Sequence, residues 1–198
     1  MLVGCTRLVS GAAELPPTGT PGPMLPAGVD VEKIMLDSPR MRAIAGAGEE
    51  MTIIPSMDAK SPVDVDPLAA TVPSECRFVY AETATFGTGF TQFHKITFQY
   101  PPRGALISEG AAAYPDPDTA RRAFDVLVAT VSGCADSSAG AMLVGEWDAG
   151  AGSLQTRTGR CGRDYRVKSA ALLEVTFCGF PQSVADLVMT NMAAGVPG

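Results

Sequence analysis

The sequence predicts an α+β domain, in which helices pack on one face of an antiparallel β-sheet and two disulfides stabilise the fold. Three observations carry this prediction. Residues 90–100 alternate between apolar and polar side chains, as a half-buried strand of an antiparallel sheet does. Residues 116–133 carry an apolar stripe at helical spacing. Four cysteines outside any Cys-x-x-Cys pair indicate disulfides in an exported protein, and they are Cys76, Cys134, Cys161 and Cys178.

The N-terminal sequence predicts a membrane attachment followed by a tether. Leu2-Val3-Gly4-Cys5 is typical of a bacterial lipobox, in which Cys5 becomes the lipid-modified first residue. We therefore expect residues 1–4 to be the remnant of a lipoprotein signal peptide, whose charged and apolar parts would lie upstream. Residues 5–30 are rich in proline and glycine and predict a flexible tether. The alternative is a chance match of four residues in front of a plain N-terminal extension.

The folded domain is expected over residues 31–198. Ser38-Pro39 and the glycine at position 46 bound a short helix. Residues 51–75 contain four prolines, so we expect loops and at most an edge strand there.

The central and C-terminal segments alternate between strands and helices. A strand over 90–100 is joined to one over 106–114 by the turn sequence Pro101-Pro102-Arg103-Gly104. Asp116 caps a helix that Gly133 ends, with Cys134 just beyond it. Further strands are expected over 142–147, 153–158, 165–168 and 171–177, and a last helix runs from Pro181 to Gly195.

Composition excludes several classes of function. The net charge is −6 and the basic residues are dispersed, which argues against nucleic-acid binding. His94 is the single histidine, and it falls in the middle of a strand, where a structural role is expected. With no second histidine and no Cys-x-x-Cys pair, the sequence predicts neither a metal site nor a cofactor. No nucleophile stands in an activating motif, so no catalytic residue is assigned.

Four cysteines allow three pairings, and the sequence alone does not choose strictly among them. Cys161 and Cys178 are equidistant from Ser169-Ala170, so a tight hairpin turning there places them opposite each other. The same register puts Asp164 on the apolar face of the hairpin, and a bulge or a longer turn is the alternative register. Cys76 and Cys134 are then the remaining pair.

The second half of the chain resembles the PknH-like extracellular domain family. The resemblance rests on Ala112-Ala113-Tyr114-Pro115-Asp116 opening a helix, on Arg160-Cys161, and on Val175-Thr176-Phe177-Cys178 before a closing helix. It implies an antiparallel sheet with helices on one side, disulfides Cys76–Cys134 and Cys161–Cys178, and a cleft for an unknown ligand. It implies no catalytic residues. The chain is most similar to the stand-alone lipoprotein branch, because Cys5 supplies an anchor.

These observations predict a lipoprotein on the extracytoplasmic face of the cell membrane, with a non-catalytic, sensor-like domain that binds an unknown small ligand in a cleft. The ligand-binding residues are not assigned. The alternative function is a protein-interaction or envelope-organising module that has no small-molecule ligand. The expected partners are the membrane, through the lipid on Cys5, and either a small molecule or an envelope protein.

Overall fold

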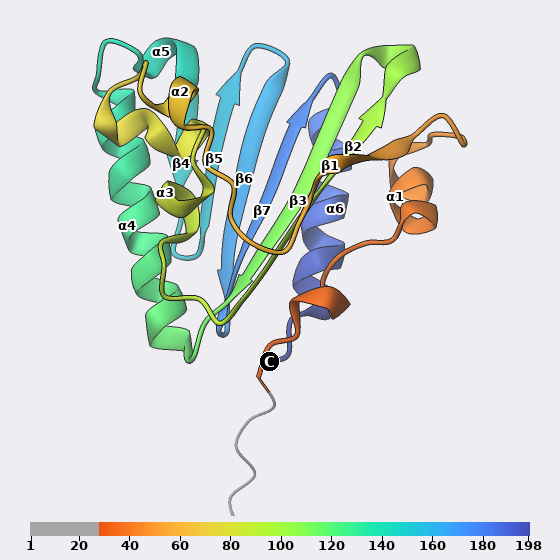
Figure 1. Cartoon of the computed structure of the whole chain (residues 1–198), viewed down its shortest axis with the longest axis horizontal. Helices are drawn as coiled ribbons and strands as arrows, with labels where there is room; N and C mark the ends of the chain where they lie inside the picture. Colours follow the sequence, from red (N-terminus) through yellow and green to blue (C-terminus); the bar gives the residue numbers. More distant parts are fainter. Residues whose placement is uncertain (1–27) are drawn as a thin grey trace, which may run out of the picture.

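The computed structural model describes residues 28–198, and seven antiparallel strands form one sheet at its centre (Figure 1). The strand order is β1-β2-β3-β7-β6-β5-β4. Two meanders, β1-β2-β3 and β4-β5-β6-β7, meet where β3 pairs with β7. The strands are β1 (Thr52–Ala59), β2 (Gln92–Tyr100), β3 (Ala105–Ala113), β4 (Glu146–Ala149), β5 (Ser153–Thr158), β6 (Cys161–Lys168) and β7 (Ala171–Cys178).

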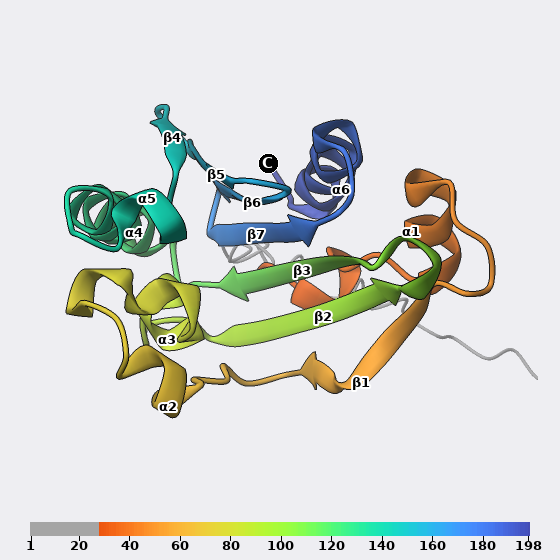
Figure 2. The ribbon, with the colours of Figure 1, turned by 90° about the horizontal axis from the view of Figure 1, so that it is seen from above.

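Helices cover both faces of this sheet, as the view from above shows (Figure 2). One face, here the α6 face, packs against α1 (Ser38–Ala45) and α6 (Gln182–Gly195). The other face, here the cleft face, packs against α4 (Pro117–Ala135). The short elements are η1 (Val31–Lys33), α2 (Asp66–Ala69), η2 (Ser74–Val79), α3 (Glu82–Phe86), η3 (Pro101–Arg103) and α5 (Gly140–Leu143).

The predicted α+β class with an antiparallel sheet is confirmed, but the expectation that helices pack on a single face is wrong. The reason lies in β7, where Leu172 points to the cleft face while Leu173 and Val175 point to the α6 face, all three fully buried. A strand that is apolar on both sides needs cover on both sides. Phe124 and Leu127 of α4 bury one side, and α6 buries the other.

Two disulfides, Cys76–Cys134 and Cys161–Cys178, cross-link the described part of the chain. The helix disulfide, Cys76–Cys134, ties η2 to α4, and both of its cysteines are fully buried. The hairpin disulfide, Cys161–Cys178, joins β6 to β7 where these two residues are register partners. The pairing expected from the sequence is therefore present in the structure.

The β6–β7 hairpin adopts the tight register, without the bulge or longer turn that was considered. Lys168 pairs with Ala171 across a two-residue turn, and Ser169 takes a positive φ of 50° to close it. Asp164 consequently lies on the α6 face beside Val175 and is 4% exposed. Its charge is compensated there by an ion pair with Arg157 and a hydrogen bond from Gln182.

Several element boundaries differ from those expected. Helix α4 continues past Gly133 to Ala135, so Cys134 lies inside the helix rather than after it. Gly133 lies inside α4, next to the side chain of Glu75 in η2. The strand expected over 142–147 is wrong in its first half, which forms α5, and the chain turns at Gly145 with a φ of 64° before β4 begins.

The N-terminal predictions fall largely outside the described residues. Cys5 and the tether up to residue 27 belong to that part, so acylation and tethering stay predictions. Val29 is already buried at 6% exposure, and Asp30 caps η1 by accepting a hydrogen bond from the amide of Glu32. The packed domain thus begins slightly before the expected boundary at residue 31.

Candidate functional site

A cleft of about 440 Å³ opens on the cleft face of the sheet. Its floor is made by side chains from four neighbouring strands, β2, β3, β7 and β6. Its walls come from β1 and the loop that follows it, from η2 and from α3. The floor residues are Lys95, Thr97, Ser108, Thr176 and Arg163.

The cleft is open because the middle of the outer strand, β1, is not paired with β2. β1 pairs with β2 at both of its ends, but the register shifts between Ile53 and Asp58. The following loop then crosses to α3, where the amide of Val63 donates to Glu82 and the amide of Thr83 donates to Asp64. These contacts hold the wall at a distance from the floor.

A buried charge cluster lies at the centre of the floor. Glu174 on β7 is 1% exposed, and its Oε2 lies 2.8 Å from the Lys95 Nζ. Its Oε1 lies 3.3 Å from Arg163 Nη1 and accepts a hydrogen bond from the Thr176 hydroxyl. Burial opposes ionisation of this carboxylate, but Lys95 and Arg163 outweigh it, so the pKa of Glu174 is lowered. The cluster is a charged, hydrogen-bonded unit inside the fold.

The two cations of this cluster also hold the walls. Arg163 Nη2 donates to the carbonyl oxygen of Val79 at 2.9 Å, which fixes η2 over the floor. Lys95 Nζ lies 3.2 Å from Glu82 Oε1, which fixes α3. Floor and walls are thus connected by one hydrogen bond and one ion pair, and the cleft is preformed rather than assembled by a ligand.

The walls are mainly apolar. Met57, Val63 and Val65 are exposed by 46%, 50% and 43%, and they line the cleft together with the buried Phe78. A concave site with apolar walls and a few fixed polar groups is the usual form of a small-molecule site. The arrangement can hold a small molecule by contact with these side chains.

His94 lies on the opposite face of the sheet from this cleft. It is 5% exposed, with Nε2 2.8 Å from Asp58 Oδ1 and Nδ1 3.2 Å from Glu32 Oε1. These contacts fit the structural role expected from the sequence. Within residues 28–198 there is no group of three or more potential ligands positioned to hold a metal ion.

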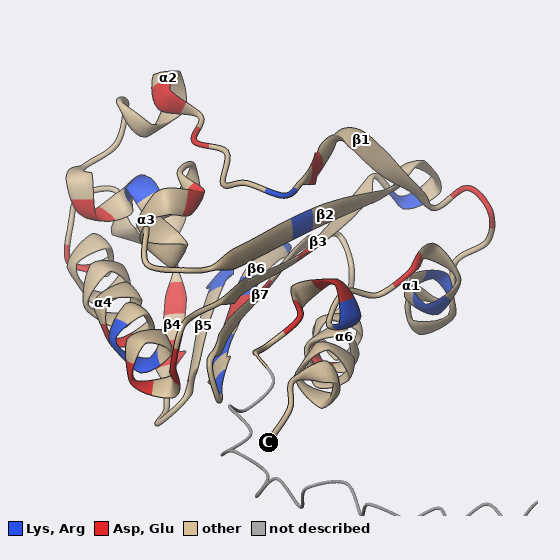
Figure 3. Cartoon of the chain, turned by 60° about the horizontal axis from the view of Figure 1, so that its bottom comes forward, with Lys and Arg blue, Asp and Glu red and all other residues tan. Residues whose placement is uncertain are grey.

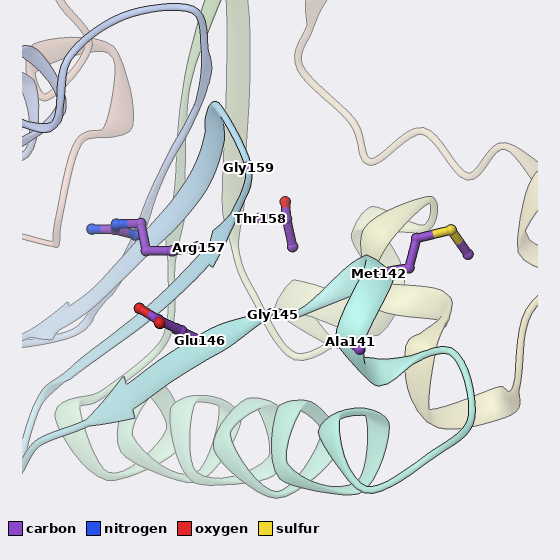
Figure 4. Close-up of a pocket in the computed structure, with 7 residues that line it drawn as sticks. All are labelled: Ala141, Met142, Gly145, Glu146, Arg157, Thr158 and Gly159. Carbon is purple, nitrogen blue, oxygen red and sulfur yellow. The ribbon is translucent and has the colours of Figure 1, made fainter.

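A second hollow, of about 730 Å³, lies beside the sheet edge formed by β4 and β5 (Figure 4). Its side chains do not converge: Arg157 and Glu146 point to one side and Met142 points to the other. Arg157 is also committed elsewhere, since it pairs with Asp164 and stacks over Phe177 at 5.4 Å. This hollow is therefore a weaker candidate than the cleft, despite its larger volume.

The surface charges do not point to a nucleic-acid ligand. Acidic and basic positions are scattered over the helices and strands in Figure 3, rather than gathered on one basic face. Trp147 lies on the edge strand β4 and is 38% exposed. None of the described helices combines the length and apolar character needed to cross a membrane.

Comparison with known proteins adds a family to this geometry. The model of the PknH-like extracellular domain matches residues 26–194. The chain belongs to this family. The crystal structure of the extracellular domain of PknH from Mycobacterium tuberculosis superposes with a TM-score of 0.62 at 14% identity, covering 85% of this chain and 96% of that one. No curated protein matches the sequence. Membership of this family indicates an extracytoplasmic location.

Sequence reasoning located the four disulfide cysteines but not the cleft residues. The signal for the floor was present in β2, where Lys95 and Thr97 alternate with the apolar Ile96 and Phe98. A second signal was Glu174, the single charged residue in the otherwise apolar first part of β7. Each of these two signals marks polar positions on a buried strand. Only the pairing of the strands shows that these positions lie close together on the same face of the sheet.

Proposed function

We propose that this protein is a cell-envelope lipoprotein whose extracellular domain binds a small ligand in the cleft, as a sensor-like module without catalytic activity. The observation that carries the proposal is the preformed cleft, with apolar walls at Met57, Val63 and Val65 over the buried charge cluster of Glu174. Such a site binds without a large rearrangement, because its walls are already fixed.

Membership of the PknH-like extracellular domain family supports a sensor-like role. In the present chain the candidate anchor is Cys5, which lies in a lipobox sequence. Several acyl chains give stable membrane attachment, whereas one gives only marginal attachment.

Intact-mass analysis of the full chain purified from native membranes tests the anchor. We expect acylation at Cys5 together with four hydrogens fewer than the fully reduced protein, and we expect Cys5→Ser to move the protein into the released fraction. An unmodified Cys5 in membrane-derived protein would contradict the proposed attachment.

Native mass spectrometry of the same preparation tests the cleft. Val65→Trp places a large ring at the mouth of the cleft, and Leu187→Trp introduces the same ring on α6, at a residue of similar exposure (43% and 50%). We expect a co-purified small molecule on the wild type and on Leu187→Trp, but not on Val65→Trp. Equal occupancy of both variants, or a wild type that carries nothing, would refute cleft binding.

The alternative, a protein-interaction module, is favoured by one specific feature. Met57, Val63, Val65 and Leu68 are all exposed by more than 40% and lie in one short segment at the cleft. Exposed apolar patches mark contact sites for proteins as well as for ligands. Under this alternative Val65→Trp alters partner binding without displacing any small molecule.

A further inference from the structure

Building on the proposed function, we infer that the ligand of the cleft is an uncharged amphiphile: a molecule with a hydroxyl, amide or carbonyl head and an apolar body. The head lies on the row of hydroxyls in the floor, and the body lies against the apolar walls. Three features of the cleft lead to this ligand class.

The first feature is that the charges of the cleft are already balanced. Lys95 and Arg163 are matched by Glu82 and Glu174, at distances between 2.8 and 3.3 Å. A carboxylate or phosphate on a ligand would have to take one of these cations from Glu174, which is 1% exposed. A buried carboxylate that loses its partner is strongly destabilising, so an anionic ligand is disfavoured. A cationic ligand meets the same difficulty, because both carboxylates are already paired.

The second feature is a row of hydroxyls across the floor. Thr97, Ser108 and Thr176 are register partners on the adjacent strands β2, β3 and β7, so their side chains lie side by side on the cleft face. The Thr97 and Ser108 hydroxyls share one hydrogen bond of 2.8 Å, which uses one of their two hydrogens. One hydroxyl hydrogen and several lone pairs are not used by this bond, and Thr97 (1% exposed) and Ser108 (8% exposed) present a small part of their surface to the cleft. Neutral donors and acceptors suit a neutral polar head.

The third feature is the separation of polar and apolar surfaces. The hydroxyl row lies on the floor, whereas Met57, Val63 and Val65 form the wall near the mouth. A ligand that reaches both must be polar at one end and apolar at the other. The volume of about 440 Å³ limits it to a small molecule.

Titration of the full-length protein with three probes that share an eight-carbon alkyl chain tests the inference. The probes are octyl glucoside (neutral), octyl sulfate (anionic) and octyltrimethylammonium (cationic), each kept below the concentration at which it forms micelles. Amide chemical-shift changes by NMR locate the binding, and calorimetry gives the affinity. We expect octyl glucoside to shift the amides of the cleft and to bind at least tenfold more tightly than either charged probe.

A double variant, Thr97→Val with Ser108→Ala, tests the role of the hydroxyl row. Both partners of one hydrogen bond are removed together, so no buried polar group is left unpaired and the fold is expected to persist. We expect this variant to bind octyl glucoside about fivefold more weakly than the wild type. Thr190→Val, an exposed threonine on α6, is the matched control and should leave the affinity unchanged.

The outcomes separate this inference from the proposed function. Tighter binding of octyl sulfate or octyltrimethylammonium in the cleft would overturn the uncharged ligand class and leave cleft binding standing. Full affinity for octyl glucoside in the double variant would overturn the assignment of the head to the hydroxyl row. Failure of all three probes to shift any cleft amide would overturn both the ligand class and the proposed small-molecule site.

Discussion

Replacing Glu109 by glutamine should change how the stability of the protein depends on pH. Glu109 lies on β3 and points to the α6 face, where it is fully buried beside Ile96 and Val175. Its Oε1 accepts a hydrogen bond of 2.8 Å from the amide of Leu36, while its Oε2 has no partner among the described residues. Glutamine keeps the acceptor oxygen for Leu36 and removes the ionisable group.

The magnitude follows from the pKa of the buried carboxyl group. Burial raises the pKa of Glu109 from 4.5 to about 8, although the Leu36 amide and the charge of Arg40 act in the opposite direction. Between these two values the unfolded chain is ionised and the folded chain keeps its proton, so stability falls as pH rises. The full loss amounts to about 5 kcal/mol, a large share of the roughly 5–15 kcal/mol that stabilises a domain.

Urea unfolding monitored by far-ultraviolet circular dichroism between pH 5 and pH 9 measures this effect, with the disulfides intact. We expect the stability of Glu109→Gln relative to the wild type to increase steadily up to about pH 8 and then to level off. Glu50→Gln, a change at an exposed carboxylate, is the control and should follow the wild type. A difference between Glu109→Gln and the wild type that stays constant from pH 5 to pH 9 would refute the reasoning.

Four further changes have sizes that the structure predicts, each measured by urea or guanidinium unfolding. Removal of the helix disulfide by Cys76→Ser with Cys134→Ser should lower the free energy of unfolding by about 4 kcal/mol, and removal of the hairpin disulfide should lower it by about 3 kcal/mol. The helix disulfide contributes more because it closes the longer loop, with a sequence separation of 58 against 17. A larger loss for the hairpin disulfide would contradict the chain-entropy account. Leu127→Ala empties a fully buried position of α4 and should cost about 2–5 kcal/mol, whereas Val126→Ala, at 63% exposure, should cost less than about 0.5. Gly104→Ala forces a side chain into a φ of 57° and should cost about 1 kcal/mol; an unchanged midpoint would contradict this strain.

The sheet could be predicted from the sequence because its signals are local. Alternation in β2 gave the strand and the direction of its side chains, and Asp116 gave the start of α4, where it accepts a hydrogen bond from the Thr119 amide. The sequence also predicted that the β6–β7 hairpin turns at Ser169, but it left the register open between a tight turn, which buries Asp164, and a bulge or longer turn. Local chemistry of this kind is readable without tertiary information.

The cleft could not be predicted in the same way, because long-range contacts build it. Its walls are held by hydrogen bonds from Val63 to Glu82 and from Arg163 to Val79, across sequence separations of 19 and 84 residues. The loop that carries Val63 has no periodic pattern, so its position over the sheet depends on long-range contacts, which also include the bond from the Thr83 amide to Asp64 and the bond from the Val65 amide to the Tyr80 carbonyl. The placement of helices on both faces was missed for a related reason, since a run such as Leu172-Leu173 does not show which helix covers which side.

Two buried glutamates on opposite faces of the sheet have pKa values that are shifted in opposite directions. Glu174 lies among Lys95, Arg163 and Thr176, and its lowered pKa means that it contributes stability above pH 4.5 that is lost as the pH falls further. Glu109 lies among apolar side chains, so its ionisation destabilises the folded state. The part of the α6 face around Glu109 therefore behaves as a core that resists charge. The cleft face instead keeps fixed charges beneath a solvent-accessible hollow, where Lys95 and Arg163 pair with Glu174 and also contact the walls at Glu82 and Val79. A purely structural sheet gains little from such a buried cluster, since apolar residues of the same size stabilise as well or better. Beneath the open cleft, its contacts with Glu82 and Val79 hold the floor to the walls and so keep the cleft in a fixed shape.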